Sequence, residues 1–228
     1  MCQMYSYKLP KLFQPFDCDS LYRLGKDNDG GYIVNSSDVA TSSKLISLGI
    51  GTDWSFEKHF LSLNNCKLEA YDGSLDITDE VKQFFTNDRK IHQKNIGDKE
   101  GEVPFSSIID GHEIFLKCDI EGSEYGILND IINHTFRFSG LIIEFHNIND
   151  PENFNDLTNF VSKINQKIIH VHVNNYFYYK TPTQNIPDIL EITFSSSKNV
   201  RYNQSLTLPR NLDMPNNPKD DEFKLFFK

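Results

Sequence analysis

The sequence predicts an α/β fold built around a mostly parallel sheet, and three observations lead to this prediction. Short apolar runs alternate with helical patterns along residues 44–200. The run at 140–146 is apolar almost throughout, as expected of a strand that is covered on both faces. The last two expected strands, 167–174 and 188–196, leave no room for a helix between them. Alternation favours a parallel sheet, and the final loop-joined pair adds one antiparallel strand.

Each expected element follows from its local pattern. The short apolar runs that predict strands are 44–50, 67–72, 90–97, 113–120, 140–146, 167–174 and 188–196. The segments whose apolar residues recur mainly at helical spacing are 53–63, 76–85, 124–136 and 153–164. Thr78 is a plausible N-cap for the second of these helices. Five strand–helix steps closed by a hairpin are typical of the seven-stranded, Rossmann-like sheet of class I methyltransferases.

Composition restricts the class of protein. The 228 residues suit one α/β domain, and 38% hydrophobic content is enough to build a core. There are 23 basic and 32 acidic residues and no basic stripe, so nucleic acid is not an expected partner. Four cysteines without a CxxC pair give no support to a zinc knuckle, and Cys118 is expected to be a buried free thiol. Without a signal peptide or a membrane span, the expected location is cytoplasmic.

A glycine turn follows the first strand of the predicted sheet. In "SLGIGTDWSFE" (47–57), Gly49 and Gly51 would let the backbone approach a ligand, although a tight turn without a ligand fits a lone GxG equally well. Asp72 closes the next strand, where a carboxylate can accept both hydroxyls of a ribose. Trp54 stands where a dinucleotide fingerprint has its third glycine. The pattern therefore favours S-adenosylmethionine over NAD.

At these residues the chain resembles the FkbM-type S-adenosylmethionine-dependent methyltransferases. The motifs that carry the resemblance run in family order and are "RLGKDNDGGYIV" (23–34), "SLGIGTDWSFE" (47–57), "EAYDGS" (69–74), "FLKCDIEGSEYGIL" (115–128) and "LIIEFH" (141–146). They extend through most of residues 20–146, and "KCDIEGSE" is the most specific part. The resemblance implies methyl transfer, mostly to oxygen and often on saccharides or secondary metabolites. Carbohydrate modification and polysaccharide biosynthesis are the processes it suggests.

The resemblance also implies where the cofactor binds. By position, the cofactor-binding residues would be Asp29, Gly31, Gly49, Gly51, Asp72, Gly73, Ile96 and Asp119. The turn "DGGY" (29–32) would fold over the cofactor as a lid, and an ordinary surface turn is the alternative. The expected organisation is an N-terminal segment with the lid (1–43), a methyltransferase domain (44–200) and a C-terminal tail packed on it (201–228).

Three carboxylates lie within six residues where the fourth strand ends: Asp119, Glu121 and Glu124. Repulsion and burial both make such a group costly, so something must offset the charge. Glu124 is expected to be only a helix-start carboxylate favoured by the helix dipole. Lys117 points the same way along the strand as Asp119 and could pair with Asp119 or Glu121. The expected catalytic residues are Asp119, His146, Glu121 and Lys117.

Other polar residues should reach the same edge of the sheet. His172 and Asn174 lie toward the end of one strand, and Glu191 lies near the start of its antiparallel neighbour. Oxygen-rich ligands with imidazole suit Mg²⁺ or Mn²⁺. The ligands that this pattern suggests are Asp119, Glu121, His146, His172 and Glu191. A metal would lower the pKa of an acceptor hydroxyl, whereas a histidine would otherwise serve as general base, and the sequence leaves both open.

The leading hypothesis for function is an O-methyltransferase acting on a sugar, a nucleotide sugar or a saccharide. An NAD-dependent oxidoreductase and a non-catalytic binding module on the same fold are the alternatives. The tyrosine-rich run 174–180 and Arg210 could line the acceptor site for a sugar or phosphate. The expected partners are a small-molecule or saccharide substrate and a second copy of the chain in a homodimer.

Overall fold

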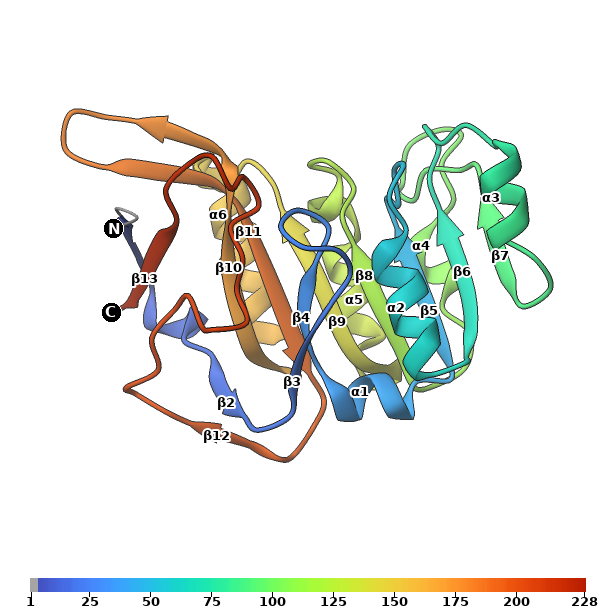
Figure 1. Cartoon of the computed structure of the whole chain (residues 1–228), viewed down its shortest axis with the longest axis horizontal. Helices are drawn as coiled ribbons and strands as arrows, with labels where there is room; N and C mark the ends of the chain where they lie inside the picture. The colour runs from blue at the N-terminus through green and yellow to red at the C-terminus, as the bar shows by residue number, and fades with distance from the viewer. Residues whose placement is uncertain (1–3) are drawn as a thin grey trace.

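The computed structural model describes residues 4–228 and has a seven-stranded sheet at its centre (Figure 1). The strand order is β10-β11-β9-β8-β5-β6-β7. All neighbouring strands are parallel except β11, which is antiparallel to both β10 and β9. The prediction of a Rossmann-like class I methyltransferase sheet, mostly parallel with one antiparallel strand, is therefore confirmed.

The observed elements follow the predicted order. The strands of the central sheet are β5 (Lys44–Leu48), β6 (Lys67–Tyr71), β7 (Arg89–His92), β8 (Ile114–Cys118), β9 (Phe138–Phe145), β10 (Lys167–Lys180) and β11 (Asn185–Ser195). The α-helices are α1 (Ser36–Thr41), α2 (Ser55–Leu63), α3 (Asp79–Phe84), α4 (Phe105–Ile108), α5 (Leu128–Asn133) and α6 (Pro151–Lys163). The side chain of Thr78 accepts a hydrogen bond from the backbone N–H of Val81 and caps α3, as predicted.

Several expected elements differ from the structure, among them the strand expected at 90–97, which is observed only as β7. The helix expected at 124–136 is divided into η2 (Glu124–Ile127), α5 and η3 (Thr135–Arg137). Gly126 weakens the first turn, and the Glu124 side chain turns back into the preceding loop. Strands β10 and β11 extend beyond their expected ends and form a long hairpin that projects from the sheet at the upper left of Figure 1.

The two ends of the chain pair with each other beside the central sheet. The strands outside the central sheet are β1 (Tyr5–Leu9), β2 (Phe16–Cys18), β3 (Leu21–Leu24), β4 (Tyr32–Asn35), β12 (Val200–Tyr202) and β13 (Phe223–Phe227), and η1 is Lys11–Phe13. Strand β1 runs parallel to β13, β2 pairs with β12, and β3 pairs with β4. The sequence did not predict these short strands. The partners β1 and β13, and β2 and β12, lie near opposite ends of the chain, whereas β3 and β4 are joined by the turn-rich segment 25–31.

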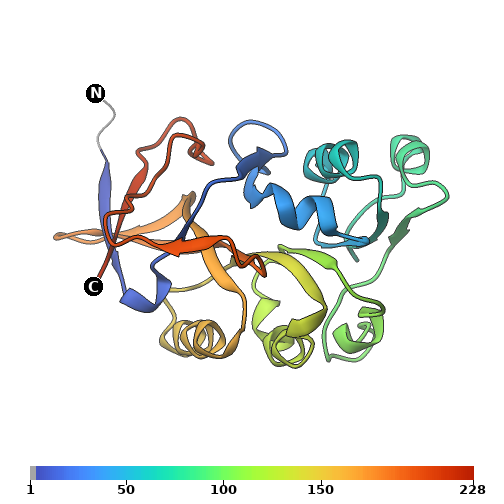
Figure 2. The same cartoon turned by 90° about the horizontal axis from the view of Figure 1, so that it is seen from below.

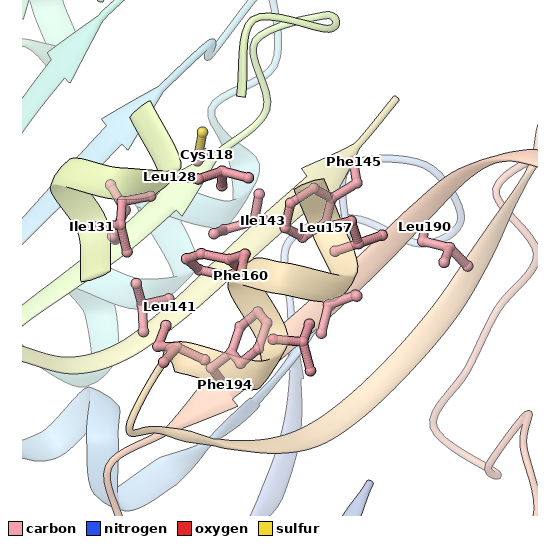
Figure 3. Close-up of a cluster of buried hydrophobic side chains, with 14 of the residues drawn as sticks. Cys118, Leu128, Ile131, Leu141, Ile143, Phe145, Leu157, Phe160, Leu190 and Phe194 are labelled. Atoms are coloured by element: carbon pink, nitrogen blue, oxygen red, sulfur yellow. The ribbon is translucent and has the colours of Figure 1, made fainter. Parts of the chain in front are cut away.

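Helices cover both faces of the sheet (Figure 2). Helices α5 and α6 pack on one face over a large apolar cluster. The residues labelled in Figure 3 show this cluster: Cys118, Leu128, Ile131, Leu141, Ile143, Phe145, Leu157, Phe160, Leu190 and Phe194. Cys118 is a buried free thiol, as expected, and Cys2 lies outside the described residues. In residues 4–228, none of the helices is both long enough and apolar enough for a membrane span.

Candidate active site

The glycine turn after β5 serves two different purposes. Gly49 has φ of 71°, and a Cβ there would lie 1.6 Å from the carbonyl oxygen of Asp119. The absence of a side chain at Gly49 therefore makes room for the neighbouring strand end. Gly51 has φ of 51°, and a Cβ there would meet nothing within 4 Å. Gly51 faces open space at the carboxyl edge of the sheet, where α/β folds bind ligands.

Two adjoining cavities of about 290 and 300 Å³ lie at this edge. The residues that line both are Gly49, Asp72, Ser74, Asp119 and Glu121. The first cavity continues to Lys26, Asp29, Gly30, Tyr32 and Lys117. The second continues to Tyr71, Asn95, Ile96 and Glu102. Because they share a wall, we treat them as one elongated cleft, which is suited to an extended ligand.

Asp72 stands at the middle of the cleft. Its Oδ2 accepts the N–H of Gly51 at 2.8 Å, and its Oδ1 accepts the backbone N–H and the hydroxyl of Ser74 at 2.8 and 2.7 Å. Burial raises the pKa of Asp72, but these hydrogen bonds outweigh burial and hold the pKa below its usual range. The carboxylate is therefore charged, fixed in place, and still able to accept a ligand hydroxyl at Oδ2.

The predicted cofactor residues do not all line this cleft. Asp29, Gly49, Gly51, Asp72, Ile96 and Asp119 line it, together with Gly30. Gly31 packs against Arg23, whose guanidinium would lie 2.5 Å from a Cβ at Gly31. Gly73 packs against the Asn95 side chain, to which its N–H donates a hydrogen bond at 3.0 Å. Sequence analysis missed Glu102 because its loop has no regular pattern.

A cluster of acidic side chains and one imidazole adjoins the cleft at Asp119. Nε2 of His146 lies 3.9 Å from Oδ1 of Asp119 and 3.8 Å from Oε1 of Glu144. Asp119, Glu144 and His146 can each offer one ligand atom, all within 4.8 Å of one another. Glu144 was not predicted. The signal that could have identified it is a single charged residue inside the apolar run "LIIEF".

Glu124 has a more specific role than the one expected of it. The residue is fully buried, and its Oε1 accepts the N–H groups of Ile120 at 3.1 Å and Gly122 at 3.2 Å. The same oxygen lies 2.9 Å from Nδ1 of His146. Glu124 therefore holds the loop after β8 and orients the imidazole. Glu121, in that loop, has φ of 54°, and its side chain is 88% exposed, with Oε2 3.5 Å from Nε2 of His146.

The half-buried Asp119 and the buried Glu144 resist ionisation. Burial raises the pKa of Asp119 to about 6, although Lys117 and His146 lower it. Burial, and next the charge of Asp119, raise the pKa of Glu144 well above its usual range. The hydroxyl of Tyr32 lies 3.3 Å from Oδ2 of Asp119 and 3.2 Å from Oε2 of Glu144. Without an added cation, the two carboxyl groups therefore carry fewer than two negative charges near neutral pH.

Lys117 does not pair with the carboxylates expected for it. Its Nζ lies 3.8 Å from Oε1 of the fully buried Glu57 on α2 and donates to the carbonyl of Gly49 at 3.2 Å. Burial lowers the pKa of Lys117, but Glu57 and then Asp119 outweigh burial and raise it. Lys117 is thus a buried cation that lines the cleft and supports the glycine turn.

His172 and Glu191 belong to a neighbouring network. Glu191 on β11 lies between His172 on β10 and Glu144 on β9, directly opposite each of them in register. However, Nδ1 of His172 lies 3.3 Å from Glu191 and Nε2 lies 3.2 Å from Glu222. Asn216 donates to the remaining Glu191 oxygen at 2.7 Å. These contacts leave His172 and Glu191 outside the group that could share one metal ion.

The expected aromatic wall with Arg210 is not observed at the cleft. Arg210 binds Asp17 at 3.1 Å and the carbonyl of Ile169 at 3.1 Å, and so it anchors the C-terminal segment. Tyr176 and Phe177 are exposed on the projecting hairpin and do not line either cavity of the cleft. The sequence could not reveal this, because the hairpin carries residues 176–180 away from the sheet edge, whereas the buried Asn174 stays there and donates a hydrogen bond to Glu144 at 2.9 Å.

Comparisons with known proteins give only weak likenesses. No protein-family model matches the chain, and no curated protein matches it. Precorrin-6y C5,15-methyltransferase from Geobacter metallireducens is 14% identical over 71% of this chain and 86% of that chain, with a TM-score of 0.42. The Methanococcus jannaschii fibrillarin pre-rRNA processing protein is 14% identical over 81% of this chain and 84% of that chain, with a TM-score of 0.41.

A third structure, the N-terminal domain of human METTL16 in complex with SAH, is 12% identical over 72% of this chain and 64% of that chain, with a TM-score of 0.40. At such low identities and TM-scores, these likenesses identify neither a family nor a substrate for this chain.

Proposed function

We propose that the protein is an S-adenosylmethionine-dependent methyltransferase. The observation that carries the proposal is Asp72, a charged carboxylate fixed at the middle of a cleft that opens beside Gly51. Asp72 would hold the ribose hydroxyls of the cofactor. Ile96 would contact the adenine, with Glu102 near its polar edge. The bound cofactor supplies an electrophilic methyl group.

The acceptor that this cleft suits best is a hydroxyl of a neutral polar molecule such as a saccharide. The cleft is lined by the carboxyl groups of Asp29 and Asp119 and by Tyr32, which can hydrogen-bond several hydroxyls, and Glu144 lies behind them within 3.2 Å of the Tyr32 hydroxyl. Their negative charge disfavours a phosphate, so the nucleotide sugar becomes the weaker candidate. The resemblance to FkbM-type enzymes, which often act on saccharides, supports the same proposal.

The acceptor hydroxyl must lose its proton as the methyl group arrives, because it is otherwise a poor nucleophile. Asp119, Glu144 and His146 are the groups positioned to assist this loss. Burial lowers the pKa of His146, but the Glu124 carboxylate outweighs burial and raises the pKa. His146 is thereby more basic than a free imidazole.

Calorimetric titration with S-adenosylhomocysteine and with NAD tests the cofactor. We expect S-adenosylhomocysteine to bind, and Asp72→Ala to weaken this binding by about 1.5–3 kcal/mol, because a charge-assisted hydrogen bond is lost. Asp88→Ala is the matched control, since it removes the same charge from an exposed site at the opposite edge of the sheet. Binding of NAD alone would instead establish the oxidoreductase alternative, and binding of neither ligand would favour a non-catalytic module.

A second experiment tests the acceptor. Radiolabelled S-adenosylmethionine is incubated with neutral saccharides, nucleotide sugars and amines in parallel. We expect label in neutral saccharides as a stable methyl ether. Transfer only to amines would retain the methyltransferase proposal and overturn the choice of oxygen as acceptor.

A further inference from the structure

The orientation of His146 is typical of a histidine that binds a metal ion. A metal-bound imidazole commonly donates the N–H of its other nitrogen to a carboxylate, which fixes the ring and its tautomer. Nδ1 of His146 lies 2.9 Å from the fully buried carboxylate of Glu124. When Nδ1 donates its proton to Glu124, the neutral ring presents the lone pair of Nε2 to the cluster. Only 8% of the residue is exposed, so water does little to stabilise that nitrogen.

The surroundings of Nε2 fit an ion better than a hydrogen bond. Its distances to Oδ1 of Asp119 and Oε1 of Glu144, 3.9 and 3.8 Å, are too long for direct hydrogen bonds, and Oε2 of the exposed Glu121 lies closer, at 3.5 Å, only at the outer limit for one. The ligand atoms that the three side chains can offer all lie within 4.8 Å of one another. Three ligands spaced evenly around one ion at about 2.1 Å are about 3.6 Å apart. A single ion can therefore contact all three side chains once they draw together by about an ångström.

The charges of the cluster also call for a cation. In the described part of the chain, neither Asp119 nor Glu144 forms an ion pair with a lysine or arginine. The nearest lysine, Lys117, is engaged by Glu57 and the Gly49 carbonyl. Buried carboxylates without a cationic partner are costly, and a divalent ion would remove that cost.

We propose that Asp119, Glu144 and His146 bind one divalent cation and that Glu124 is a positioning residue for His146. Two carboxylate oxygens with one imidazole nitrogen suit Mn²⁺ better than ions that prefer all-oxygen sites. Asp119 and His146 were also expected as ligands from the sequence. Glu144 takes the place of the other expected ligands, Glu121, His172 and Glu191. The role of the ion rests on the proposed function: it would lower the pKa of an acceptor hydroxyl that enters the cleft.

Titration of the metal-free full-length protein with MnCl₂, followed by the electron paramagnetic resonance signal of free Mn²⁺, tests the site. We expect one Mn²⁺ per chain. Glu144→Gln and Asp119→Asn should each weaken binding by at least about tenfold, and Glu124→Gln by about 10- to 100-fold. Circular dichroism confirms that each variant is folded.

Glu191→Gln is the matched control, because Glu191 lies opposite Glu144 in register on β11 and is also a buried glutamate. We expect this variant to keep its Mn²⁺ affinity within about threefold. Equal weakening by Glu144→Gln and Glu191→Gln would overturn the proposal, since it would indicate general attraction by negative charge. Absence of Mn²⁺ binding to the folded wild-type protein would also overturn it.

Calorimetry with S-adenosylhomocysteine in the presence of EDTA separates this inference from the proposed function. Retained cofactor binding without a Mn²⁺ site would overturn the metal inference and leave the methyltransferase proposal intact. A Mn²⁺ site without cofactor binding would support the metal inference and overturn the methyltransferase proposal. Tight binding of a cationic amine at the cluster, in competition with Mn²⁺, would show that a substrate amine and not a metal neutralises these carboxylates.

Discussion

The two faces of β9 and β11 bury very different side chains. Toward α5 and α6, the strands present apolar residues such as Ile143 and Phe194, which pack on Phe160. Toward the N- and C-terminal segments, the same strands present Glu144 and Glu191. Alternating side chains point to opposite faces of a strand, so neighbouring residues have opposite environments.

This difference indicates which face stabilises the fold and which face performs the chemistry. Burial of apolar surface is favourable, at roughly 25 cal/mol per Å². Burial of carboxyl groups is unfavourable unless a cation compensates each charge, and within residues 4–228 Asp119 and Glu144 have hydrogen bonds from Tyr32 and Asn174 but no ion pair with a lysine or arginine. Carboxyl groups that lower the stability of the fold, and yet are present beside a cleft, are candidates for a functional role.

The largest expected effect on stability is on the apolar face. Phe160 is 1% exposed and contacts the rings of Phe145 and Phe194. Phe160→Ala should lower the free energy of unfolding by about 3–5 kcal/mol, because it removes apolar contacts and leaves a cavity. Urea denaturation measures the loss. Phe136→Ala, at a ring that is 66% exposed, is the control and should change stability by less than about 0.5 kcal/mol.

The next effect is on turnover and belongs to the polar face. Asp119→Asn should reduce methyl transfer by about 100-fold or more while the melting temperature changes little, because Asp119 lies where the sheet ends. His146→Ala is a less direct test, since it removes a partner from the buried Glu124 carboxylate and should also destabilise the fold. A large loss of stability in Asp119→Asn, with full turnover per folded molecule, would show that Asp119 stabilises the fold and takes no part in the reaction.

A smaller effect of opposite sign is expected for Glu144→Gln. The amide needs no charge compensation, so in the metal-free protein at pH 8 the variant should be more stable than wild type by about 1 kcal/mol. For a protein of this size that corresponds to a rise in melting temperature of about 2–4 °C. Differential scanning calorimetry in EDTA measures it. If the variant were less stable instead, the Glu144 carboxyl group would stabilise the fold, as the residues of the apolar face do.

The smallest effect is on the pH dependence of stability. Acids whose pKa is raised in the folded state stabilise the fold below their unfolded pKa, and this contribution is lost as pH rises through the folded pKa. For Asp119 the loss spans pH 4 to about 6, and for the buried Asp38 it extends to about 7. The melting temperature of the metal-free protein should therefore fall between pH 5 and pH 8.

Substitutions can separate the two contributions to this slope. Asp38→Asn and Glu144→Gln should each make the slope shallower, but only Glu144→Gln should also weaken Mn²⁺ binding, because Asp38 lies outside the cleft. An unchanged slope in Glu144→Gln would show that its carboxyl group keeps an ordinary pKa.

Local patterns in the sequence determined the sheet, its order of elements and the positions at its carboxyl edge. Apolar runs separated by helical patterns predict a parallel sheet, because each run can be buried only between layers. The glycine turn, Asp72 and Asp119 could be placed for the same reason, since each ends a recognisable strand. All three lie in the cleft.

Only the tertiary structure decided which polar residues act together. Glu144 meets His146 and Asp119 because β8 and β9 are neighbours in register, and Glu124 reaches back across a loop to hold the imidazole. His172 and Glu191 have the residue types of metal ligands, yet Asn216 and Glu222 from the C-terminal segment engage them. Such pairings join residues far apart in the chain and depend on distances of a few ångströms, which no local pattern of residues encodes.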